Sequence, residues 1–390
     1  MQKCQEKIHD LPTDVITEIL LRLPARSLVQ VRKVCKLWRS ITTTSYFIDM
    51  YSKYGFPSRQ QYVFVSDFDR RTISMLEPKS WRVILKLKKC ATESLELLGS
   101  CKGILCLYNY TLRCVELLNP MTCESITIPK PPMERRYLFY MGFDPSRKKF
   151  KVICRKRFCN PERWYIYTVG TDARWRHLVS MPDTSCLNCE GIYSDRALHW
   201  LGHKNGKMFL YSFDLKDETT SSIDITLCRD ISSPRWPRLF ELEGSIWLWS
   251  MYARNYGEPC IGMLEMNSVL EDQWTWKYSV RVPMSPPPRW TPLLIHNEEI
   301  IFLNDRLNLL YYYDLKQDLH KGFVACYDPE SGSPSINRDS KAANHDRKSV
   351  SCIAFRESLV EISKKKKKQR ELGCTKQMID DAFSRPMSLR

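Results

Sequence analysis

Four side chains near the middle of the chain have the types and the order of a structural zinc site. Cys186 and Cys189 form a Cys-x-x-Cys pair, and His199 and His203 follow them. Thiolates and imidazoles are common ligands of structural zinc. However, nine residues lie between Cys189 and His199, where a zinc finger has about twelve. The segment around His199 is typical of a strand, on which the two histidines would lie too far apart unless the chain turned between them. A hairpin with ordinary thiols is therefore favoured, and zinc is the minor alternative.

The sequence carries no motif of an enzyme class. A RING-type zinc lattice needs repeated Cys-x-x-Cys pairs, but the chain contains one such pair. A glycine-rich phosphate loop, a Gly-x-Ser-x-Gly turn and a His-Glu-x-x-His helix are absent from the sequence as well. We therefore expect a non-catalytic protein with no cofactor and no metal.

The cysteines and the apolar runs indicate the compartment. The 16 cysteines among 390 residues fall below the ~8–10% of disulfide-rich chains. Most lie in apolar segments, such as Cys106 in Gly-Ile-Leu-Cys-Leu, where cysteine acts as a small hydrophobic residue. No run of 18 or more apolar residues exists, and residues 1–12 contain no apolar signal segment. We expect a soluble protein of the cytoplasm or nucleus, with reduced thiols and no membrane contact.

The positive charge of the chain, +16 in total, is unevenly distributed. Residues 61–330 carry a net charge of only +4, whereas residues 1–60 carry +5 and residues 331–390 carry +7. A nucleic-acid-binding domain concentrates basic side chains on a folded face, so nucleic acid is not the expected partner. We expect residues 363–390 to form a basic, disordered tail. Its run Lys364–Lys368 is either a nuclear-localisation signal or a solvated charge run.

The first fifty residues have a helical pattern of apolar side chains. Two stripes recur at helical spacing, the first of Val15, Ile16, Ile19, Leu20 and Leu23 and the second of Leu28, Val31 and Val34. Pro24 separates the stripes, which predicts two or three short helices. About 45 residues are too few to bury such stripes alone. Either a partner covers them or the helices cap the following domain.

The same residues resemble an F-box. The resemblance rests on Leu11-Pro12, on Ile-Leu-x-Arg-Leu-Pro at residues 19–24, on Ser27-Leu28, and on Val-Cys-Lys-x-Trp-Arg-Ser at residues 34–40 with Phe47 downstream. In that family a three-helix module binds a Skp-type adaptor, which bridges to a cullin scaffold and its RING subunit. The resemblance implies that residues 1–50 form an F-box whose adaptor face and small core comprise Leu11, Pro12, Ile16, Ile19, Leu20, Leu28, Val31, Val34, Cys35 and Trp38. Which of these contact the adaptor and which pack inward stays open.

After a predicted linker at residues 51–60, the pattern changes to short runs of aromatic and β-branched residues bounded by turn residues, which predict strands. First strands of a repeat are expected to start at Ile104, Leu198, Ile246 and Ile300, each followed by a second strand that closes on an acidic or amide residue at Asn119, Asp214, Glu265 and Asp314. A degenerate unit lies near Gly142. Spacings close to 50 residues are typical of a β-propeller, so residues 61–362 would hold about six irregular blades. The predicted fold class is α+β multidomain, with a helical module before an all-β propeller.

The strand region resembles the plant F-box-associated interaction domain. A kelch propeller carries paired glycines, and this chain has no Gly-Gly pair. The resemblance rests on phrases such as Gly-Ser-Cys-Lys-Gly-Ile-Leu-Cys-Leu from residue 99 and Ser-Phe-Asp-Leu-x-x-Glu at residues 212–218, and it spans most of residues 95–320. The phrase Phe-Arg-Glu-Ser-Leu-Val from residue 355 resembles the closing segment of that family. It would return after a polar loop at residues 331–349 to complete the first or the last blade.

Together the two resemblances imply a non-catalytic receptor. It would be the substrate-recognition subunit of an SCF-type (Skp–cullin–F-box) ubiquitin ligase, with the helices on the adaptor and the propeller on a target protein. The alternative is a non-degradative propeller scaffold or a ligand-sensing interaction protein, and RNA binding through the tail ranks third. The target is not indicated, because binding loops share no sequence signature.

Overall fold

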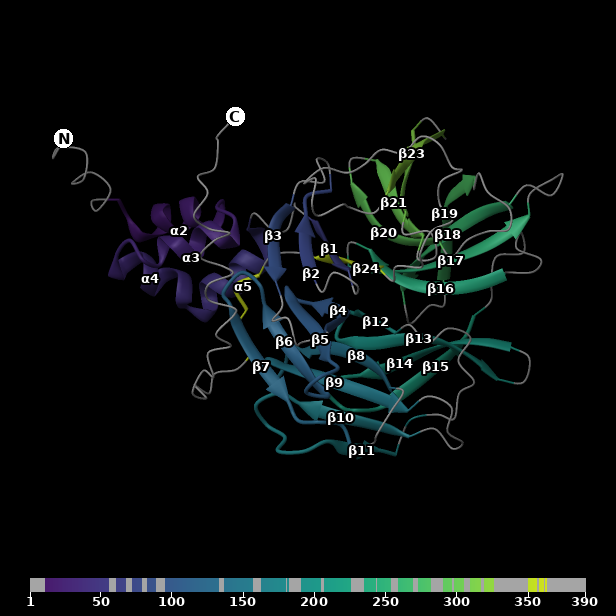
Figure 1. The fold of residues 1–390 in the computed structure, drawn as a ribbon, viewed down its shortest axis with the longest axis horizontal. Coiled ribbons are helices and arrows are strands. Elements are labelled where there is room, and N and C mark those ends of the chain that lie inside the picture. The colour runs from purple at the N-terminus through teal and green to yellow at the C-terminus, as the bar shows by residue number, and fades with distance from the viewer. Residues whose placement is uncertain are drawn as a thin grey trace.

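The fold is that of a computed structural model of the full chain, in which short helices precede a ring of strands (Figure 1). The structure describes residues 11–55, 61–67, 72–78, 83–88, 95–132, 137–156, 163–179, 181, 191–204, 207–225, 235–242, 244–253, 259–268, 273–281, 290–296, 298–304, 309–316, 319–325, 350–355, 358–360 and 362. The predicted polar loop at residues 331–349 and the predicted tail at residues 363–390 lie outside these ranges, as do residues 1–10.

Within the described residues, four helices open the chain: α2 (Thr13–Leu21), α3 (Ala25–Val31), α4 (Lys36–Thr43) and α5 (Ser45–Tyr54). Pro24 lies directly before α3, and its fixed φ suits a helix start. Side chains cap the last two helices. The Cys35 Sγ accepts a hydrogen bond from the Trp38 N–H (3.4 Å), and the Thr44 Oγ1 accepts one from the Phe47 N–H (3.1 Å). Local sequence therefore accounts for where these helices begin.

The helix α5 corrects two sequence predictions. Three helices and a linker over residues 51–60 were expected, but α5 adds a fourth helix and continues to Tyr54. Phe47 and Tyr51 lie one turn apart and are both buried, with ring centroids 6.0 Å apart. The Tyr51 hydroxyl also donates to the Leu23 carbonyl at 2.9 Å. This long-range contact stabilises a segment of modest helix propensity, so a local pattern did not indicate it.

In the described part of the chain, 24 strands form six antiparallel sheets of four strands, the blades of a propeller. Blade 1 contains β24 (Val350–Phe355), β1 (Tyr62–Asp67), β2 (Thr72–Leu76) and β3 (Val83–Lys88), and blade 2 contains β4 (Leu95–Cys101), β5 (Ile104–Asn109), β6 (Cys114–Asn119) and β7 (Glu124–Ile128). Blade 3 contains β8 (Tyr137–Asp144), β9 (Lys149–Lys156), β10 (Trp164–Thr168) and β11 (Arg176–Leu178), and blade 4 contains β12 (Ile192–Ser194), β13 (Ala197–Lys204), β14 (Lys207–Asp214) and β15 (Thr220–Asp224). Blade 5 contains β16 (Arg235–Leu242), β17 (Ser245–Ala253), β18 (Pro259–Ser268) and β19 (Gln273–Arg281), and blade 6 contains β20 (Trp290–His296), β21 (Glu299–Asn304), β22 (Leu309–Asp314) and β23 (Leu319–Ala325). The expected number of blades and the all-β character are confirmed.

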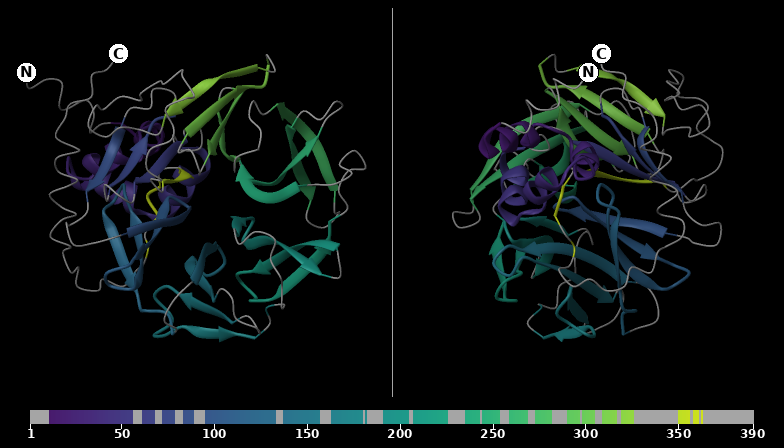
Figure 2. Two further views of the ribbon diagram at one scale, coloured as in Figure 1. Left: turned by 45° about the vertical axis from the view of Figure 1, so that its right-hand side comes forward. Right: turned by 90° about the vertical axis from the view of Figure 1, so that its left-hand side faces the viewer.

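The blades are arranged in a closed ring (Figure 2). The strands β24, β4, β8, β12, β16 and β20 contact one another in that order, and β20 contacts β24. These are the inner strands of the ring. Blade 1 receives its inner strand from the C-terminal part of the chain, where β24 pairs antiparallel with β1 from Tyr62–Phe355 to Asp67–Val350. The expected return of the chain is confirmed, and it completes the first blade.

The repeat found in the sequence corresponds to the second and third strands of a blade. Ile104, Leu198, Ile246 and Ile300 lie at or one residue after the start of β5, β13, β17 and β21. The strands predicted there are confirmed, but each is the second strand of its blade and not the first. The second strands carry the clearest apolar runs because both of their faces pack against neighbouring blades. The closing residue turns the chain into the fourth strand. The Asp214 Oδ1 accepts hydrogen bonds from the N–H groups of Lys216 (2.7 Å) and Asp217 (2.9 Å), and the Asn119 Oδ1 makes the equivalent bonds.

Apolar side chains fill the boundaries between blades. Trp164 of blade 3 stacks on Trp200 of blade 4 with centroids 5.4 Å apart. Val63 of blade 1 shares a core with Leu294 of blade 6, across the boundary that closes the ring. A further core joins blades 1 and 2 to the helices and includes Leu359, which follows β24. The helices therefore lie beside blades 1 and 2, as Figure 1 shows.

Candidate protein-binding site

The structure divides the ten residues expected on the adaptor face and in the small core of the helical module into three groups. The exposed group is Leu11, Pro12, Ile19 and Val34. The half-buried group is Val31, Cys35 and Trp38, and the buried group is Ile16, Leu20 and Leu28. The sequence had left this division open, because a helical stripe does not say which of its neighbours is solvent.

Two further apolar residues are exposed on the same helices. The side chain of Val15 on α2 is 42% exposed and that of Leu37 on α4 is 38% exposed. Val15 lies one turn before Ile19, which is 49% exposed, so these two side chains share one face of α2. Val34, at the α3–α4 junction, is 67% exposed. We call Leu11, Pro12, Val15, Ile19, Val34 and Leu37 the exposed apolar set. Sequence reasoning left Val15 and Leu37 out of the site, although Val15 belongs to the first predicted stripe.

The buried face of the helices packs on the propeller. Ile16, Leu20 and Leu28 share one core with Tyr62 of blade 1 and Leu105 of blade 2. The helices thus bury one face in a core that they share with the propeller and present apolar side chains to solvent with the other. This agrees with the interpretation that the helices cap the following domain.

Polar contacts fix the loop that carries Val34. The Arg32 guanidinium donates to the Thr42 carbonyl (2.8 Å), and the Thr42 hydroxyl donates to the Trp38 carbonyl (2.8 Å). Thr42 is fully buried. These bonds hold the end of α3 against α4. An ordered loop presents an exposed apolar side chain at little entropic cost to binding.

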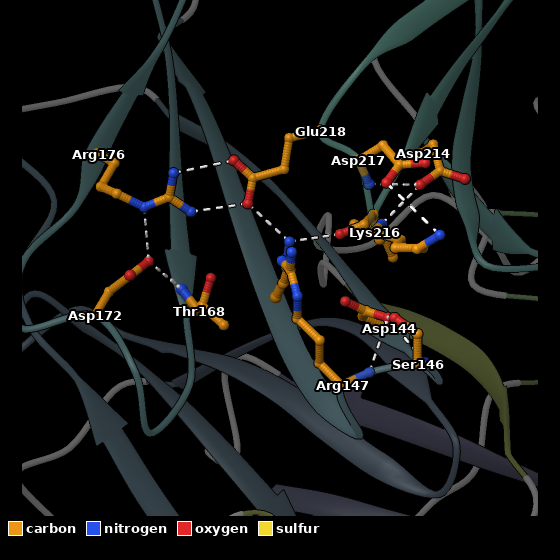
Figure 3. A network of polar contacts seen from close by, with 12 residues as sticks. Asp144, Ser146, Arg147, Thr168, Asp172, Arg176, Asp214, Lys216, Asp217 and Glu218 are labelled. Atoms are coloured by element: carbon orange, nitrogen blue, oxygen red, sulfur yellow. Dashed lines mark hydrogen bonds and ion pairs between the residues drawn. The ribbon is translucent and has the colours of Figure 1, made fainter.

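An ion-pair cluster joins blade 3 to blade 4 (Figure 3). Glu218, in the turn after β14, accepts two hydrogen bonds from the Arg176 guanidinium, at 3.0 and 2.8 Å, and one from the Lys151 ammonium at 2.7 Å. Arg176 also pairs with Asp172 at 3.1 Å. The Lys151 side chain is completely buried, and its Nζ also donates to the Leu215 carbonyl. Hydrogen bonds from the Arg176 guanidinium and the Lys151 ammonium, aided by their charges, lower the pKa of Glu218 to about 2, against the opposing effect of its desolvation.

A smaller ion pair joins the helices to blade 3. The Lys148 Nζ, in the β8–β9 turn, lies 3.0 Å from the Asp49 Oδ2 on α5. Both side chains are more than half exposed, so the pair adds little stability. The pair shows that the end of blade 3 with the β8–β9 turn faces the helices.

Comparison with protein families identifies both parts of the chain, with matches that overlap in the region of α4 and α5. Residues 8–49 match the F-box domain, and residues 35–331 match the F-box associated beta propeller domain. The second match covers most of the chain. The chain belongs to the family of F-box proteins with an F-box-associated β-propeller.

The relatives of this F-box protein include F-box proteins of Arabidopsis thaliana. Putative F-box protein At5g42430 is 25% identical over 70% of this chain and 72% of its own length. Putative F-box protein At1g47790 is 30% identical over 42% of this chain, and the match spans 45% of that relative. Among solved structures, a chain of the nidogen/laminin complex aligns at a TM-score of 0.44 with 10% identity, over 76% of this chain and 99% of that chain.

The propeller of this F-box protein places the two candidate zinc-binding histidines on one strand. His199 and His203 both lie on β13, so the predicted strand is confirmed. His199 is buried, its Nε2 donates to the Ser194 carbonyl (3.2 Å), and its Nδ1 accepts from the Ser212 hydroxyl (2.8 Å). Both ring nitrogens of His199 are thus engaged in hydrogen bonds within blade 4. Cys186 and Cys189 lie outside the described residues, and among those that are described no cluster of metal-ligating side chains occurs. Burial lowers the pKa of His199 to about 4.

None of the described helices of this F-box protein combines the length and hydropathy needed to cross a membrane.

Proposed function

We propose that this F-box protein is the substrate-recognition subunit of an SCF-type ubiquitin ligase. The observation that carries the proposal is the exposed apolar set, because it lies on helices whose other apolar side chains are already buried in the core shared with blades 1 and 2. Exposed apolar side chains gathered on a small module mark a protein-binding surface. The occupant we infer is a Skp-type adaptor, which connects the protein to a cullin and a RING subunit.

The role proposed for the propeller is to hold a target protein. Its cores lie between the blades, so the ring is a rigid platform of fixed geometry. A receptor of this kind needs no catalytic group. It holds an acceptor lysine of the target near the conjugating enzyme, which replaces a bimolecular encounter with a high effective concentration. We place this activity in the cytoplasm, the nucleus or both, which imaging of a fluorescent fusion tests with and without Lys364–Lys368.

The test of the proposal is co-purification of the full chain with a plant Skp-type adaptor. A variant with Ile19→Glu and Val34→Glu places two charges in the exposed apolar set and should lose the adaptor. The matched control is Val179→Glu, which places the same charge on an 85% exposed valine of blade 3 and should retain it. Equal adaptor recovery from the wild type and the double variant would contradict the proposal.

A second measurement separates the proposal from a non-degradative scaffold or a ligand sensor. Proteins that bind the propeller should accumulate when the proteasome or the cullin is inhibited, and in cells that express the Ile19→Glu/Val34→Glu variant. Turnover that ignores both treatments would favour the alternative.

A further inference from the structure

A row of aromatic rings lies where blade 2 meets blade 3. Tyr110, Tyr108, Phe139 and Tyr137 contact in sequence, with centroid distances of 5.0, 5.3 and 5.7 Å. They come from the end of β5, the turn after it and the start of β8. Tyr110 is 47% exposed and the other three are half-buried. We call these four residues the aromatic row.

The aromatic row lies at the end of blade 3 that faces away from the helices. It includes the first residues of β8, whereas the turn after the last residue of β8, Asp144, carries Lys148, which pairs with Asp49 on α5. A strand of this length spans about 25 Å. The row therefore stays accessible when an adaptor occupies the exposed apolar set.

Hydrogen bonds hold the row and its turn in place. The Tyr110 hydroxyl donates to the Glu96 carboxylate at 2.5 Å. The buried Asn109 side chain accepts from the Leu112 N–H (3.0 Å) and donates to the buried Glu116 carboxylate (2.9 Å). The turn therefore presents Leu112, which is 57% exposed, as a fixed side chain. Rigid aromatic and aliphatic groups bind a partner with a small loss of conformational entropy.

Basic side chains border the row on the side away from the exposed Glu96, whose carboxylate is occupied by the Tyr110 hydroxyl. Arg113 follows Leu112 in the turn and is exposed. Lys156 lies directly opposite Tyr137 in the β8–β9 register, and its N–H donates to the carbonyl of Arg163, which is also exposed (3.1 Å). The partner that complements this surface carries carboxylates around an apolar side chain.

We propose that the aromatic row binds an extended acidic segment of the target protein. An apolar side chain of that segment packs against Tyr110 and Leu112, and its carboxylates face Arg113 and Arg163. This proposal rests on the proposed receptor function and names the chemistry of the target.

A protein segment fits the row better than single-stranded nucleic acid does. Base stacking needs open ring faces along a basic groove, but Tyr108 and Phe139 stack on one another at 5.3 Å, so their facing sides are occupied. The exposed aliphatic side chain of Leu112 also has no role in base stacking. Nucleic acid is therefore an outcome of the test that would overturn the proposal.

The test uses the full chain in complex with a Skp-type adaptor and measures fluorescence anisotropy of labelled probes. The main probe is the peptide Asp-Glu-Asp-Leu-Phe-Glu-Asp-Glu. One control peptide replaces every carboxylate by its amide, and another replaces Leu and Phe by Ser. The main probe should bind at least about tenfold more tightly than either control, since both charge and apolar contact contribute. Equal affinities, or tighter binding of an oligouridine of similar length, would overturn the proposal.

Variants locate the binding to the row. Leu112→Ser with Arg113→Glu changes two exposed side chains of one turn and should weaken the main probe by about tenfold or more. The control Lys216→Glu makes the same charge reversal in the exposed β14–β15 turn and should leave the affinity unchanged. Equal weakening by both would mean non-specific attraction and would overturn the proposal. Adaptor recovery is measured in parallel, because its loss in the wild type contradicts the proposed receptor function and not the surface.

Discussion

At the scale of single residues, Glu218 connects two blades through one carboxylate. Its backbone φ is +57°, a left-handed conformation that favours glycine and costs other residues roughly 1–2 kcal/mol. The contacts with Arg176 and the buried Lys151 offset that cost, which explains a glutamate at a position suited to glycine. The ion pairs of the Glu218 carboxylate, and not the backbone conformation of the β14–β15 turn, favour glutamate at this position.

Replacing Glu218 by Gln should destabilise the propeller, because the charge of Lys151 would stay buried without its carboxylate partner. We expect a loss of roughly 2–4 kcal/mol, below the value for a fully enclosed pair since the Glu218 side chain is 20% exposed. Asp224→Asn removes the carboxylate of an exposed pair with Lys207 and should cost less than about 1 kcal/mol. Urea unfolding followed by tryptophan fluorescence measures both. Similar losses in the two variants would contradict a special role for the buried lysine.

His199 should make the propeller less stable in mild acid. Burial lowers its pKa from 6.5 to about 4, so the unfolded chain binds a proton first as the pH falls. The stability is complete above about pH 6.5 and is lost between there and about pH 4, by up to ~3 kcal/mol. Glu218, with its pKa lowered to about 2, contributes to the pH dependence only below its unfolded value of 4.5.

The pH effect is tested by unfolding the wild type and His199→Gln at pH 7.5 and pH 5. Most of the difference between the two pH values should disappear in the variant, because Gln does not titrate. An unchanged difference would assign the acid sensitivity to other groups.

At the scale of elements, α2 has two faces with different tasks. Ile16 and Leu20 are buried in the core that the helices share with blades 1 and 2, whereas Val15 and Ile19 are exposed. The four apolar residues were equivalent in the sequence pattern. The buried residues Ile16 and Leu20 therefore contribute to the free energy of unfolding, and the exposed residues Val15 and Ile19 are available to a partner.

Substitutions on the buried face of α2 should therefore lower stability, and substitutions on its exposed face should weaken adaptor binding. Leu20→Ala should lower the free energy of unfolding by about 2–5 kcal/mol, as a cavity in a packed core does. Ile19→Ala should change stability by less than about 0.5 kcal/mol but weaken adaptor binding. Thermal unfolding and adaptor titration of the same two variants check this. A stability loss that is larger for Ile19→Ala would reverse the assignment of the faces.

At the scale of the whole molecule, the two ends of the propeller sequence meet in blade 1. β24 supplies the inner strand of that blade and contacts both β4 and β20. The segment after it is anchored as well, because the Asn119 amide donates to the carbonyls of Ser358 and Val360, both at 3.1 Å. The ring closes only when this C-terminal segment is in place.

Two truncations should distinguish the contribution of the closing strand β24 to stability from that of residues 363–390. A chain ending at residue 349 lacks β24 and the buried Leu359, so β1 keeps β2 but has one unpaired edge, and the shared core is incomplete. We expect it to aggregate or to unfold without cooperativity. A chain ending at residue 362 should unfold like the full chain. Limited proteolysis and thermal unfolding measure both, and a stable chain ending at residue 349 would contradict closure by β24.

The sequence alone determined that a helical module precedes an all-β region, that this region is a propeller of about six blades, and which family the helical module resembles. These properties follow from local periods, turn residues and a repeat near 50 residues, which need no knowledge of distant contacts. Tertiary structure decided the rest. The closing strand lies about 290 residues from its partner, and α5 depends on a hydroxyl that reaches Leu23. The division of the candidate adaptor residues into exposed and buried groups also required the fold, because the core shared by the helices and the propeller buries one face of the helices and leaves the other in solvent.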